Sequence, residues 1–256
     1  VHGTLEAYEQ AKARLWAHQP TDGIAIANAG DPAVLRNLPG RPTDLTFGSG
    51  SSHASTEGGT LTVLGQSLGG VEELPRHLPH DVENYLAAAL VAMTAGASAS
   101  AARGVLGEFR GLPHRMELVA RADGISWFND SKATTPHAVV TGVSGHNSVV
   151  LIAGGRNKGV DLAPLRDLAP VLRSVVAIGE AGSEIAAAFD GVVDVVEASS
   201  MESAVCIASN AASPGDAVVL SPGCTSYDWY QDYSARGDDF VRKVLALTGA
   251  RPEGRE

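Results

Sequence analysis

The sequence has little cysteine, few basic residues and no long apolar run, and each shortage narrows its possible functions. Cys206 and Cys224 are its two cysteines, and without metal-type or disulfide-rich spacing they favour a reducing cytosol. Lysine and arginine number 19 against 29 acidic residues. The net charge of -10 argues against a nucleic-acid-binding surface. The longest apolar stretch, residues 86–97, is well short of the ~20 residues of a membrane span, so we expect no membrane insertion.

What is present is typical of a globular protein, with 44% hydrophobic and 19% charged residues. A length of 256 residues allows one large domain or two of ordinary size. The chain begins Val1-His2-Gly3 rather than with Met, no secretory signal opens it, and its first residues already lead towards a helix. We therefore expect a fragment whose N-terminal portion is missing.

The first half of the chain mixes helical and β patterns. Apolar residues at helical spacing predict a helix over 5–17 with Thr4 as its N-cap, and Asp31-Pro32 predicts the start of another helical turn. Gly, Ser and Thr are frequent over 46–73, which predicts short strands and hairpins. The other elements expected here are a strand over 23–28 and helices over 81–95 and 98–109.

After Gly111 the pattern changes to alternating strands and helices, beginning with a hairpin over 116–128 that turns at Asp123-Gly124. Such alternation predicts crossover units and a mostly parallel sheet, hence an α/β fold. We place a domain boundary between residues 109 and 110. The expected strands span 149–153, 175–178, 192–196 and 217–220, and the expected helices span 162–172, 183–189, 201–212 and 227–247.

Two lysine-bearing segments follow expected strands, where parallel sheets bind ligands. Residues 129–134 (Asn-Asp-Ser-Lys-Ala-Thr) would place Lys132 beside the N–H groups of a helix start, which suits an anion. A helix cap with a solvated lysine explains the same residues. Residues 153–159 resemble a phosphate loop but lack its Gly-Lys-Ser/Thr sequence. Lys158 could pair with a substrate carboxylate or simply lie exposed in a glycine turn.

A third segment, residues 220–228, concentrates hydroxyl groups at an expected strand-to-helix turn, with Arg236-Gly237 further along the helix. A capped helix with an aromatic core stripe explains this pattern equally well. Ser226 lies in no Gly-x-Ser-x-Gly turn and Cys224 has no obvious histidine partner, so a nucleophilic triad is not favoured. The eight histidines show no metal-type pairs, and we expect no zinc site.

Taken in order, these segments resemble the Mur ligase family over nearly the whole chain. The similarity rests on residues 8–14, 111–115 and 129–134, on Gly154-Gly155 with Lys158, and on residues 221–237. It implies the last part of a central ATP-binding domain over 1–109. A Rossmann-like C-terminal domain that binds the incoming amino acid would follow over 110–256. The runs at 129–134 and 221–226 are similar to those of the family member that adds D-glutamate to UDP-N-acetylmuramoyl-L-alanine in peptidoglycan precursor synthesis.

This resemblance implies a cytoplasmic, monomeric ligase that uses ATP and Mg²⁺. ATP would convert the alanyl carboxylate into an acyl phosphate, which the amine of D-glutamate then attacks. Lys12 matches a lysine that becomes carbamylated and helps to hold the magnesium ion. The implied site residues are Lys12, Lys132 and Lys158 for catalysis, Asn84, Arg115, Asp130 and Lys132 for ATP, and Thr134, Lys158, Ser226, Tyr227 and Tyr233 for D-glutamate.

The sequence departs from the family pattern at several positions. Asp81 stands where the family more often has an asparagine, and Thr135 replaces a common asparagine. The family's glycine-rich ATP loop and metal-binding histidine would precede Val1, so His2 is not that histidine and we expect the chain alone to be inactive. Three alternatives stay open: another Mur ligase, a relative of folylpolyglutamate synthetase, and a non-catalytic nucleotide-binding module.

Overall fold

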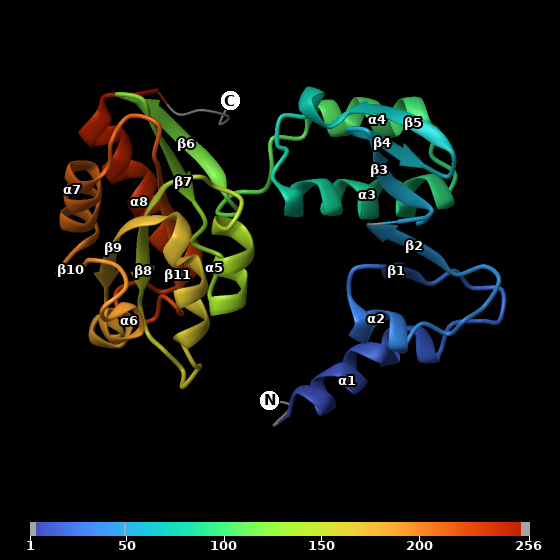
Figure 1. The fold of residues 1–256 in the computed structure, drawn as a ribbon, viewed down its shortest axis with the longest axis horizontal. Coiled ribbons are helices and arrows are strands. Elements are labelled where there is room, and N and C mark those ends of the chain that lie inside the picture. The colour runs from blue at the N-terminus through green and yellow to red at the C-terminus, as the bar shows by residue number, and fades with distance from the viewer. Residues whose placement is uncertain (1–3, 49, 252–256) are drawn as a thin grey trace. The chain divides into compact units, whose positions relative to one another are not determined.

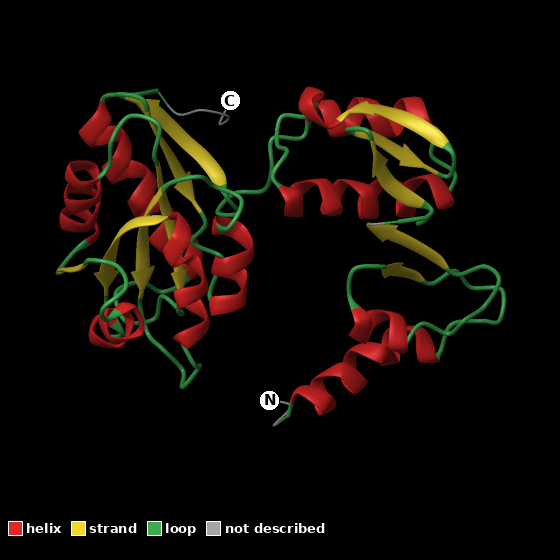
Figure 2. Cartoon of the chain, in the orientation of Figure 1, coloured by secondary structure: helices red, strands yellow, loops and turns green. Residues whose placement is uncertain are grey.

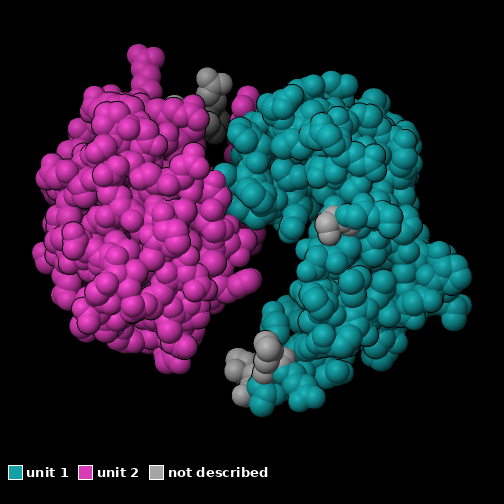
Figure 3. Space-filling model, in the orientation of Figure 1, with its two compact units in different colours: residues 1–109 teal, residues 110–256 magenta. Residues whose placement is uncertain are grey.

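The chain divides into two compact units, Val1–Phe109 (unit 1) and Arg110–Glu256 (unit 2), which Figure 3 colours separately. The computed structural model describes residues 4–48 and 50–251, so the expectations for Val1 and His2 lie outside the described residues. Each unit has a sheet and an apolar core of its own (Figures 1 and 2). Within the described residues, no helix is both long and apolar enough to cross a bilayer.

Unit 1 is built on a five-stranded sheet in the order β1-β2-β3-β4-β5, in which β1, β2 and β3 run parallel and β4 and β5 continue antiparallel. The predicted caps are confirmed: Thr4 accepts the N–H of Ala7 at 3.1 Å, and Asp31 accepts the N–H groups at the start of α2. The elements are α1 (Leu5–Ala17), β1 (Ile26–Asn28), α2 (Pro32–Arg36), β2 (Leu45–Gly48), β3 (Ala54–Glu57), β4 (Thr60–Val63), β5 (Gln66–Gly70), η1 (Val71–Glu73), α3 (Pro79–Thr94) and α4 (Ala99–Glu108).

Unit 2 is built on a six-stranded sheet in the order β10-β9-β8-β11-β7-β6. The hairpin β6–β7 is antiparallel and the other neighbours are parallel, so the predicted α/β class with a mostly parallel sheet is confirmed. The elements are β6 (Glu117–Ala122), β7 (Ile125–Asn129), α5 (Pro136–Val143), β8 (Val149–Gly154), η2 (Ala163–Val171), β9 (Leu172–Ile178), α6 (Gly182–Phe189), β10 (Val195–Ala198), α7 (Met201–Ala211), β11 (Ala217–Gly223) and α8 (Tyr233–Thr248).

The central strands of unit 2 are apolar on both sides because both faces of the sheet are covered. Along β8, Val149 and Leu151 join the core formed with α5, η2 and α6, whereas Val150 and Ile152 join the core formed with α7 and α8. Successive side chains of a strand point to opposite faces, so a continuous apolar run suits a strand between two helical layers. This arrangement exposes the ends of the central strands rather than their faces, and ligand-binding groups must therefore lie at a strand end.

Several predicted boundaries were wrong, and three of them have a clear local cause. Helix α8 begins at Tyr233 rather than at residue 227, because Asp232 accepts the N–H of Ala235 at 2.8 Å and caps the helix there. The helix expected over 162–172 is a 3₁₀ segment, Ala163–Val171, which contains Pro170 and leads directly into β9. Strand β10 spans Val195–Ala198 instead of 192–196, since the preceding residues still bond to the end of α6.

At the amino ends of the unit 2 strands, a buried carboxylate links β9 to β11. Asp216 accepts hydrogen bonds from Arg173 and, at 2.7 Å, from the N–H of Ser213. Burial by itself would raise the pKa of Asp216, but hydrogen bonds from Arg173, Ser148 and Ser213 hold it below its ordinary value of 3.8. A carboxyl group whose pKa is lowered by folding stabilises the folded state above the unfolded pKa, and this contribution is lost as the pH falls through the folded pKa.

We therefore expect Asp216→Asn to lower the free energy of unfolding at pH 7 by about 1–2 kcal/mol. Below pH 3.8 the difference between wild type and variant should shrink, because wild-type Asp216 becomes protonated and loses its advantage. Urea unfolding at pH 7 and near pH 3 measures both effects. Glu73→Gln, which breaks the exposed pair with Arg103, is the matched control and should change stability by less than ~0.5 kcal/mol. Equal gaps between Asp216→Asn and wild type at both pH values would contradict the assignment.

Candidate functional site

The loops at the carboxyl ends of β7, β11 and β8 lie side by side, since β11 is the strand between the other two. The N–H of Gly223 donates to the carbonyl of Ala133 at 2.8 Å, and the N–H of Arg156 donates to the carbonyl of Thr225 at 2.8 Å. Residues 223–225 are thus bonded on one side to the loop that carries Lys132. On the other side they are bonded to the loop that carries Lys158. All three segments singled out in the sequence meet at this edge of the sheet.

Two glycines allow the close approach of these loops. A Cβ at Gly154 would lie 2.1 Å from the carbonyl oxygen of Ile178, and a Cβ at Gly155 would lie 2.3 Å from that of Thr225. Both glycines have φ near +125°, a conformation that residues with side chains rarely adopt. The Gly-Gly pair therefore brings the backbones of β8, β9 and β11 together, whatever ligand the edge binds.

The buried side chain of Asp130 bonds the loop after β7 to its neighbours. One carboxylate oxygen accepts the N–H of Met116 at 3.2 Å, and the other accepts the hydroxyl of Ser221 at 2.7 Å. The residue is buried. The carbonyl of His114 in turn accepts the N–H of Lys132 at 3.1 Å. The backbone on both sides of Ser131 is thus fixed, and the predicted contact of Asp130 with ATP remains a prediction.

Both lysines of the edge lie over tyrosine rings. The ammonium of Lys132 is 5.4 Å from the ring centre of Tyr233, and that of Lys158 is 4.9 Å from the ring centre of Tyr227. The two lysines are exposed, and cation–π contacts of this length orient an ammonium without neutralising it. Two oriented positive charges on neighbouring loops suit an anionic ligand.

The other predicted D-glutamate residues differ in accessibility. Thr134 is half-buried and Tyr227 is 53% exposed, so both can meet a ligand. Ser226 is only 2% exposed, and its carbonyl accepts the N–H groups of Trp229 and Tyr230. In this structure Ser226 shapes the turn after β11 and its hydroxyl has little access to solvent.

Cys224 lies between the two lysine loops but does not suit a nucleophilic role. It is buried, and this burial raises the pKa of its thiol to about 11. The thiol is therefore protonated at neutral pH, whereas the thiolate is the reactive form.

Arg236, the first residue of the Arg-Gly pair in α8, joins the loops after β7 and β11, and sequence reasoning gave it no role. Its guanidinium donates to the carbonyl of Ser131 at 2.9 Å, to the hydroxyl of Ser131 at 3.0 Å and to the carbonyl of Cys224 at 3.2 Å. Only 1% of the residue is exposed. Burial lowers the pKa of Arg236 to about 10, so it stays charged at neutral pH. Its place in the apolar stripe of α8, four residues before Phe240, is the signal that could have revealed it.

A second buried group, whose contacts the sequence did not reveal, holds the end of β7. The amide nitrogen of Asn129 donates to the carboxylate of Glu117 at 3.0 Å and lies 3.0 Å from Nδ1 of His114. Helix α8 approaches this group so closely that a Cβ at Gly237 would lie 2.3 Å from Nδ1 of His114. The ring of His114 also meets that of Tyr233 edge to face, at 6.0 Å between centres. The group therefore supports the tyrosine under Lys132.

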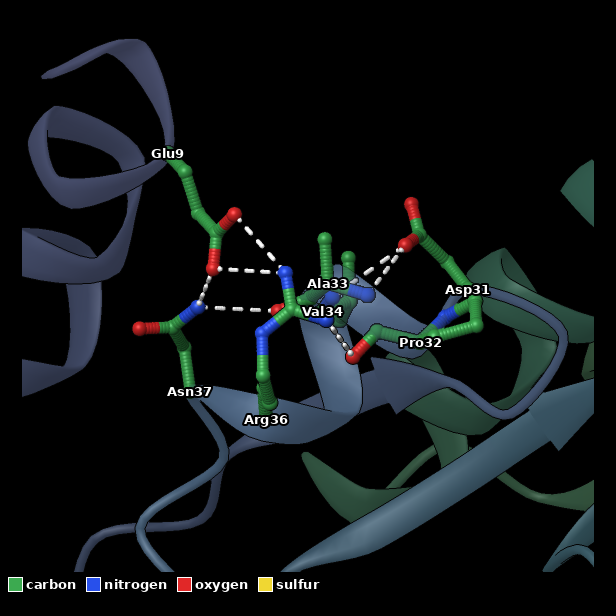
Figure 4. A network of polar contacts seen from close by, with 7 residues as sticks. All are labelled: Glu9, Asp31, Pro32, Ala33, Val34, Arg36 and Asn37. Carbon is green, nitrogen blue, oxygen red and sulfur yellow. Dashed lines mark hydrogen bonds and ion pairs between the residues drawn. The ribbon is translucent and has the colours of Figure 1, made fainter. Parts of the chain in front are cut away.

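In unit 1, Lys12 is exposed on α1, with its ammonium 5.3 Å from the ring centre of Tyr8. Glu9, one turn earlier, ties this helix to α2: it accepts two hydrogen bonds from Arg36, at 2.9 and 3.1 Å, and one from Asn37 at 2.7 Å (Figure 4). The bond from Asn37, followed by those from Arg36, lowers the pKa of Glu9. Glu9 therefore stays ionised and helps to fix the direction of the helix that bears Lys12.

The residues proposed for the nucleotide divide between the units. Asn84 is exposed on α3, and Asp81, one turn before it, is buried and pairs with Arg76 at 2.7 Å. Asp81, which stands where the family more often has an asparagine, therefore has a structural role in this ion pair. Arg115 is exposed just before β6 in unit 2.

The predicted magnesium site depends on Lys12 rather than on a cluster of metal-ligating side chains within the described residues. Among them, no group of three or more His, Cys, Asp or Glu side chains could hold a metal ion. The ammonium of Lys12 has donors but no acceptor, so as it stands it cannot ligate a cation. Carbamylation would convert it into an anion with oxygen ligands, which magnesium prefers.

Comparison with known families matches both parts of the chain. Residues 1–92 match the family "Mur ligase middle domain", and residues 114–224 match the family "Mur ligase, glutamate ligase domain". The chain belongs to the Mur ligase family, as the resemblance of its motifs predicted.

Curated proteins that are similar to the chain include several with the name UDP-N-acetylmuramoylalanine--D-glutamate ligase. It is 37% identical to that of Acidobacterium capsulatum over 97% of this chain and 57% of the relative. It is 40% identical to that of Frankia casuarinae over 97% of this chain and 55% of the relative. The chain thus spans little more than half the length of these relatives.

Solved structures show the same fold at low identity. MurF from Acinetobacter baumannii superposes with a TM-score of 0.71 at 18% identity, covering 96% of this chain and 56% of that one. UDP-N-acetylmuramate-alanine ligase MurC from Thermotoga maritima superposes with a TM-score of 0.65 at 16% identity, covering 96% of this chain and 56% of that one. These superpositions confirm the predicted fold class.

Proposed function

We propose that this chain is part of an ATP-dependent ligase that joins D-glutamate to UDP-N-acetylmuramoyl-L-alanine during peptidoglycan precursor synthesis. The names of the relatives support this substrate pair. We further propose that the enzyme works as a monomer in the cytoplasm, where ATP is available.

The observation that carries the proposal is the pair of oriented lysines at one sheet edge of unit 2. D-glutamate presents an amine and two carboxylates, and a carboxylate pairs favourably with an ammonium that already has a fixed direction. Lys158 over Tyr227 would hold a carboxylate of the amino acid, with Thr134 and Tyr233 beside it. Ser226 would contribute once the turn after β11 admits the ligand.

Two further cations of unit 2, Lys132 and Arg115, suit the phosphate chemistry. ATP, when bound, would supply the phosphoryl group that activates the alanyl carboxylate. The exposed ammonium of Lys132 and the exposed Arg115 would offset the negative charge that builds up when anionic groups approach one another. In unit 1, Asn84 would lie near the base, and Lys12, once carbamylated, would contribute to holding magnesium.

The test is amino-acid-dependent ADP formation by an extended form, in which this chain is completed to the full length of its relatives. With ATP, magnesium and UDP-N-acetylmuramoyl-L-alanine, we expect ADP release that requires D-glutamate. L-glutamate, meso-diaminopimelate and L-alanine serve as controls that separate this activity from those of other Mur ligases. Release that follows another amino acid would reassign the substrate, and nucleotide binding without release would favour the non-catalytic module.

A further inference from the structure

The two residues that precede Lys158 both have side chains held by carboxylates. The guanidinium of Arg156 donates two hydrogen bonds to Glu180, at 2.8 and 2.9 Å. The amide of Asn157 donates to Glu184 at 2.7 Å. Glu180 belongs to the loop after β9, and Glu184 to the first turn of α6. The lysine loop is therefore held from the neighbouring strand and its helix.

The backbone of the lysine loop is fixed on both sides of Lys158 as well. Arg156 and Thr225 exchange both backbone hydrogen bonds, at 2.8 and 3.1 Å, and the hydroxyl of Thr225 adds a bond to the carbonyl of Arg156 at 2.9 Å. Beyond the lysine, the side chain of Asn157 bonds to both the N–H and the carbonyl of Val160. These bonds hold the backbone of the loop before and after Lys158.

A third carboxylate, that of Asp228, connects the Glu180 loop to the turn after β11. Asp228 accepts the N–H of Glu180 at 3.0 Å, and it directly follows Tyr227, the ring that lies under the Lys158 ammonium. Hydrogen bonds from Arg156 lower the pKa of Glu180, so this carboxylate remains ionised through the neutral range. Glu180 and Glu184 therefore hold the side chains of the two residues that precede Lys158, and Asp228 bonds the Glu180 loop to the turn that carries Tyr227.

We propose that Glu180 and Glu184 are positioning residues that set the place of the Lys158 ammonium for the carboxylate of the incoming amino acid. This inference rests on the proposed function and deepens it. Neither glutamate is expected to touch D-glutamate, because like charges at close range repel one another. Glu180 acts through Arg156 and Glu184 through Asn157, the two residues that precede Lys158.

Positioning and simple electrostatics predict opposite results. If the two glutamates acted only through their negative charge, their removal would strengthen the binding of an anionic amino acid and lower its KM. If they position the loop, Glu180→Gln releases Arg156, the Lys158 ammonium loses its fixed place, and the KM for D-glutamate rises.

The experiment measures steady-state kinetics of the extended form carrying Glu180→Gln, Glu184→Gln or both. We expect each single substitution to raise the KM for D-glutamate about fivefold, with kcat and the KM for ATP changed by less than about twofold. The charge-reversed double variant Arg156→Glu/Glu180→Arg keeps a pair at this place and should recover most of the wild-type KM. Glu202→Gln, which breaks the comparable surface pair with Lys243, is the matched control and should leave the kinetics unchanged.

The two single substitutions give independent readings, because Arg156 and Asn157 each bond to a carboxylate of their own. An unchanged or lowered KM for D-glutamate in both variants of an active enzyme would overturn the positioning role. Glu180→Gln alone could raise the KM for D-glutamate while the charge-reversed variant Arg156→Glu/Glu180→Arg fails to recover it. That result would show that Glu180 does not act through Arg156, and it too would overturn the proposal. If wild type itself shows no D-glutamate-dependent ADP release, the proposed function fails, and this inference with it.

Discussion

Lys158→Ala in the extended form should raise the KM for D-glutamate by about 100-fold, while the KM for ATP changes by less than about twofold. The ammonium is exposed and held 4.9 Å from the ring centre of Tyr227. A charge-assisted hydrogen bond to a carboxylate contributes ~1.5–3 kcal/mol, and its upper end corresponds to about two powers of ten in affinity. Alanine removes the charge and the donor together, so the loss should fall on the carboxylate ligand.

Steady-state kinetics with D-glutamate and ATP varied in turn measure this effect. Lys158→Arg keeps the charge but replaces a compact ammonium with a planar fork, and should recover only part of the loss. Lys243→Ala removes a surface lysine of α8 that pairs with Glu202, and should behave as wild type. A KM for D-glutamate that stays within about twofold of wild type in Lys158→Ala would remove this residue from the site.

Arg236→Ala should lower the free energy of unfolding by about 3–5 kcal/mol, which for a protein of ordinary stability threatens the folded state. The substitution leaves the carbonyls of Ser131 and Cys224 without their buried donors, and it leaves a cavity between α8 and the sheet. Arg236→Lys keeps a charge but cannot reproduce the two-sided fork, so an intermediate loss of about 2 kcal/mol is expected.

This second prediction needs no catalytic activity and can be measured on the chain itself. Urea unfolding can be followed through circular dichroism and through tryptophan fluorescence, to which Trp127 contributes as a ring buried 6.4 Å from Phe240 of α8 between ring centres. Arg242→Ala, on the same helix with a side chain 70% exposed, is the control and should cost less than ~0.5 kcal/mol. A loss that small in Arg236→Ala would mean that the two loops are held together without the guanidinium.

Much of the fold could be read from the sequence because it depends on local pattern. Apolar runs such as residues 149–153 predicted buried strands, and Thr4 and Asp31 predicted helix starts that their hydrogen bonds confirm. The start of α8 was misplaced because Tyr227, Trp229 and Tyr230 continue the helical spacing of apolar residues. The cap at Asp232 overrides that spacing, since its side chain accepts the N–H of Ala235 and so begins the helix at Tyr233, six residues later than predicted.

The site was predicted unevenly for the same reason. Lys132 and Lys158 follow strands, and the order of a parallel sheet is enough to bring strand ends to one edge. The tyrosine under each lysine was named as a site residue, but its cation–π contact was not foreseen. Whether these side chains, with Lys12 and Asn84, bind the proposed ligands stays a prediction.

The sequence alone indicated the family, through the resemblance of its motifs, and it predicted the α/β class and the residue types that follow each strand, because these two depend on spacing along the chain. The tertiary structure decided how those residues are held. Arg236 bonds to Ser131 across 105 positions, and Arg156 bonds to Thr225 across 69. Contacts between residues so far apart exist only after strands and helices have packed, and no local pattern specifies which buried polar groups will then be satisfied by which partner.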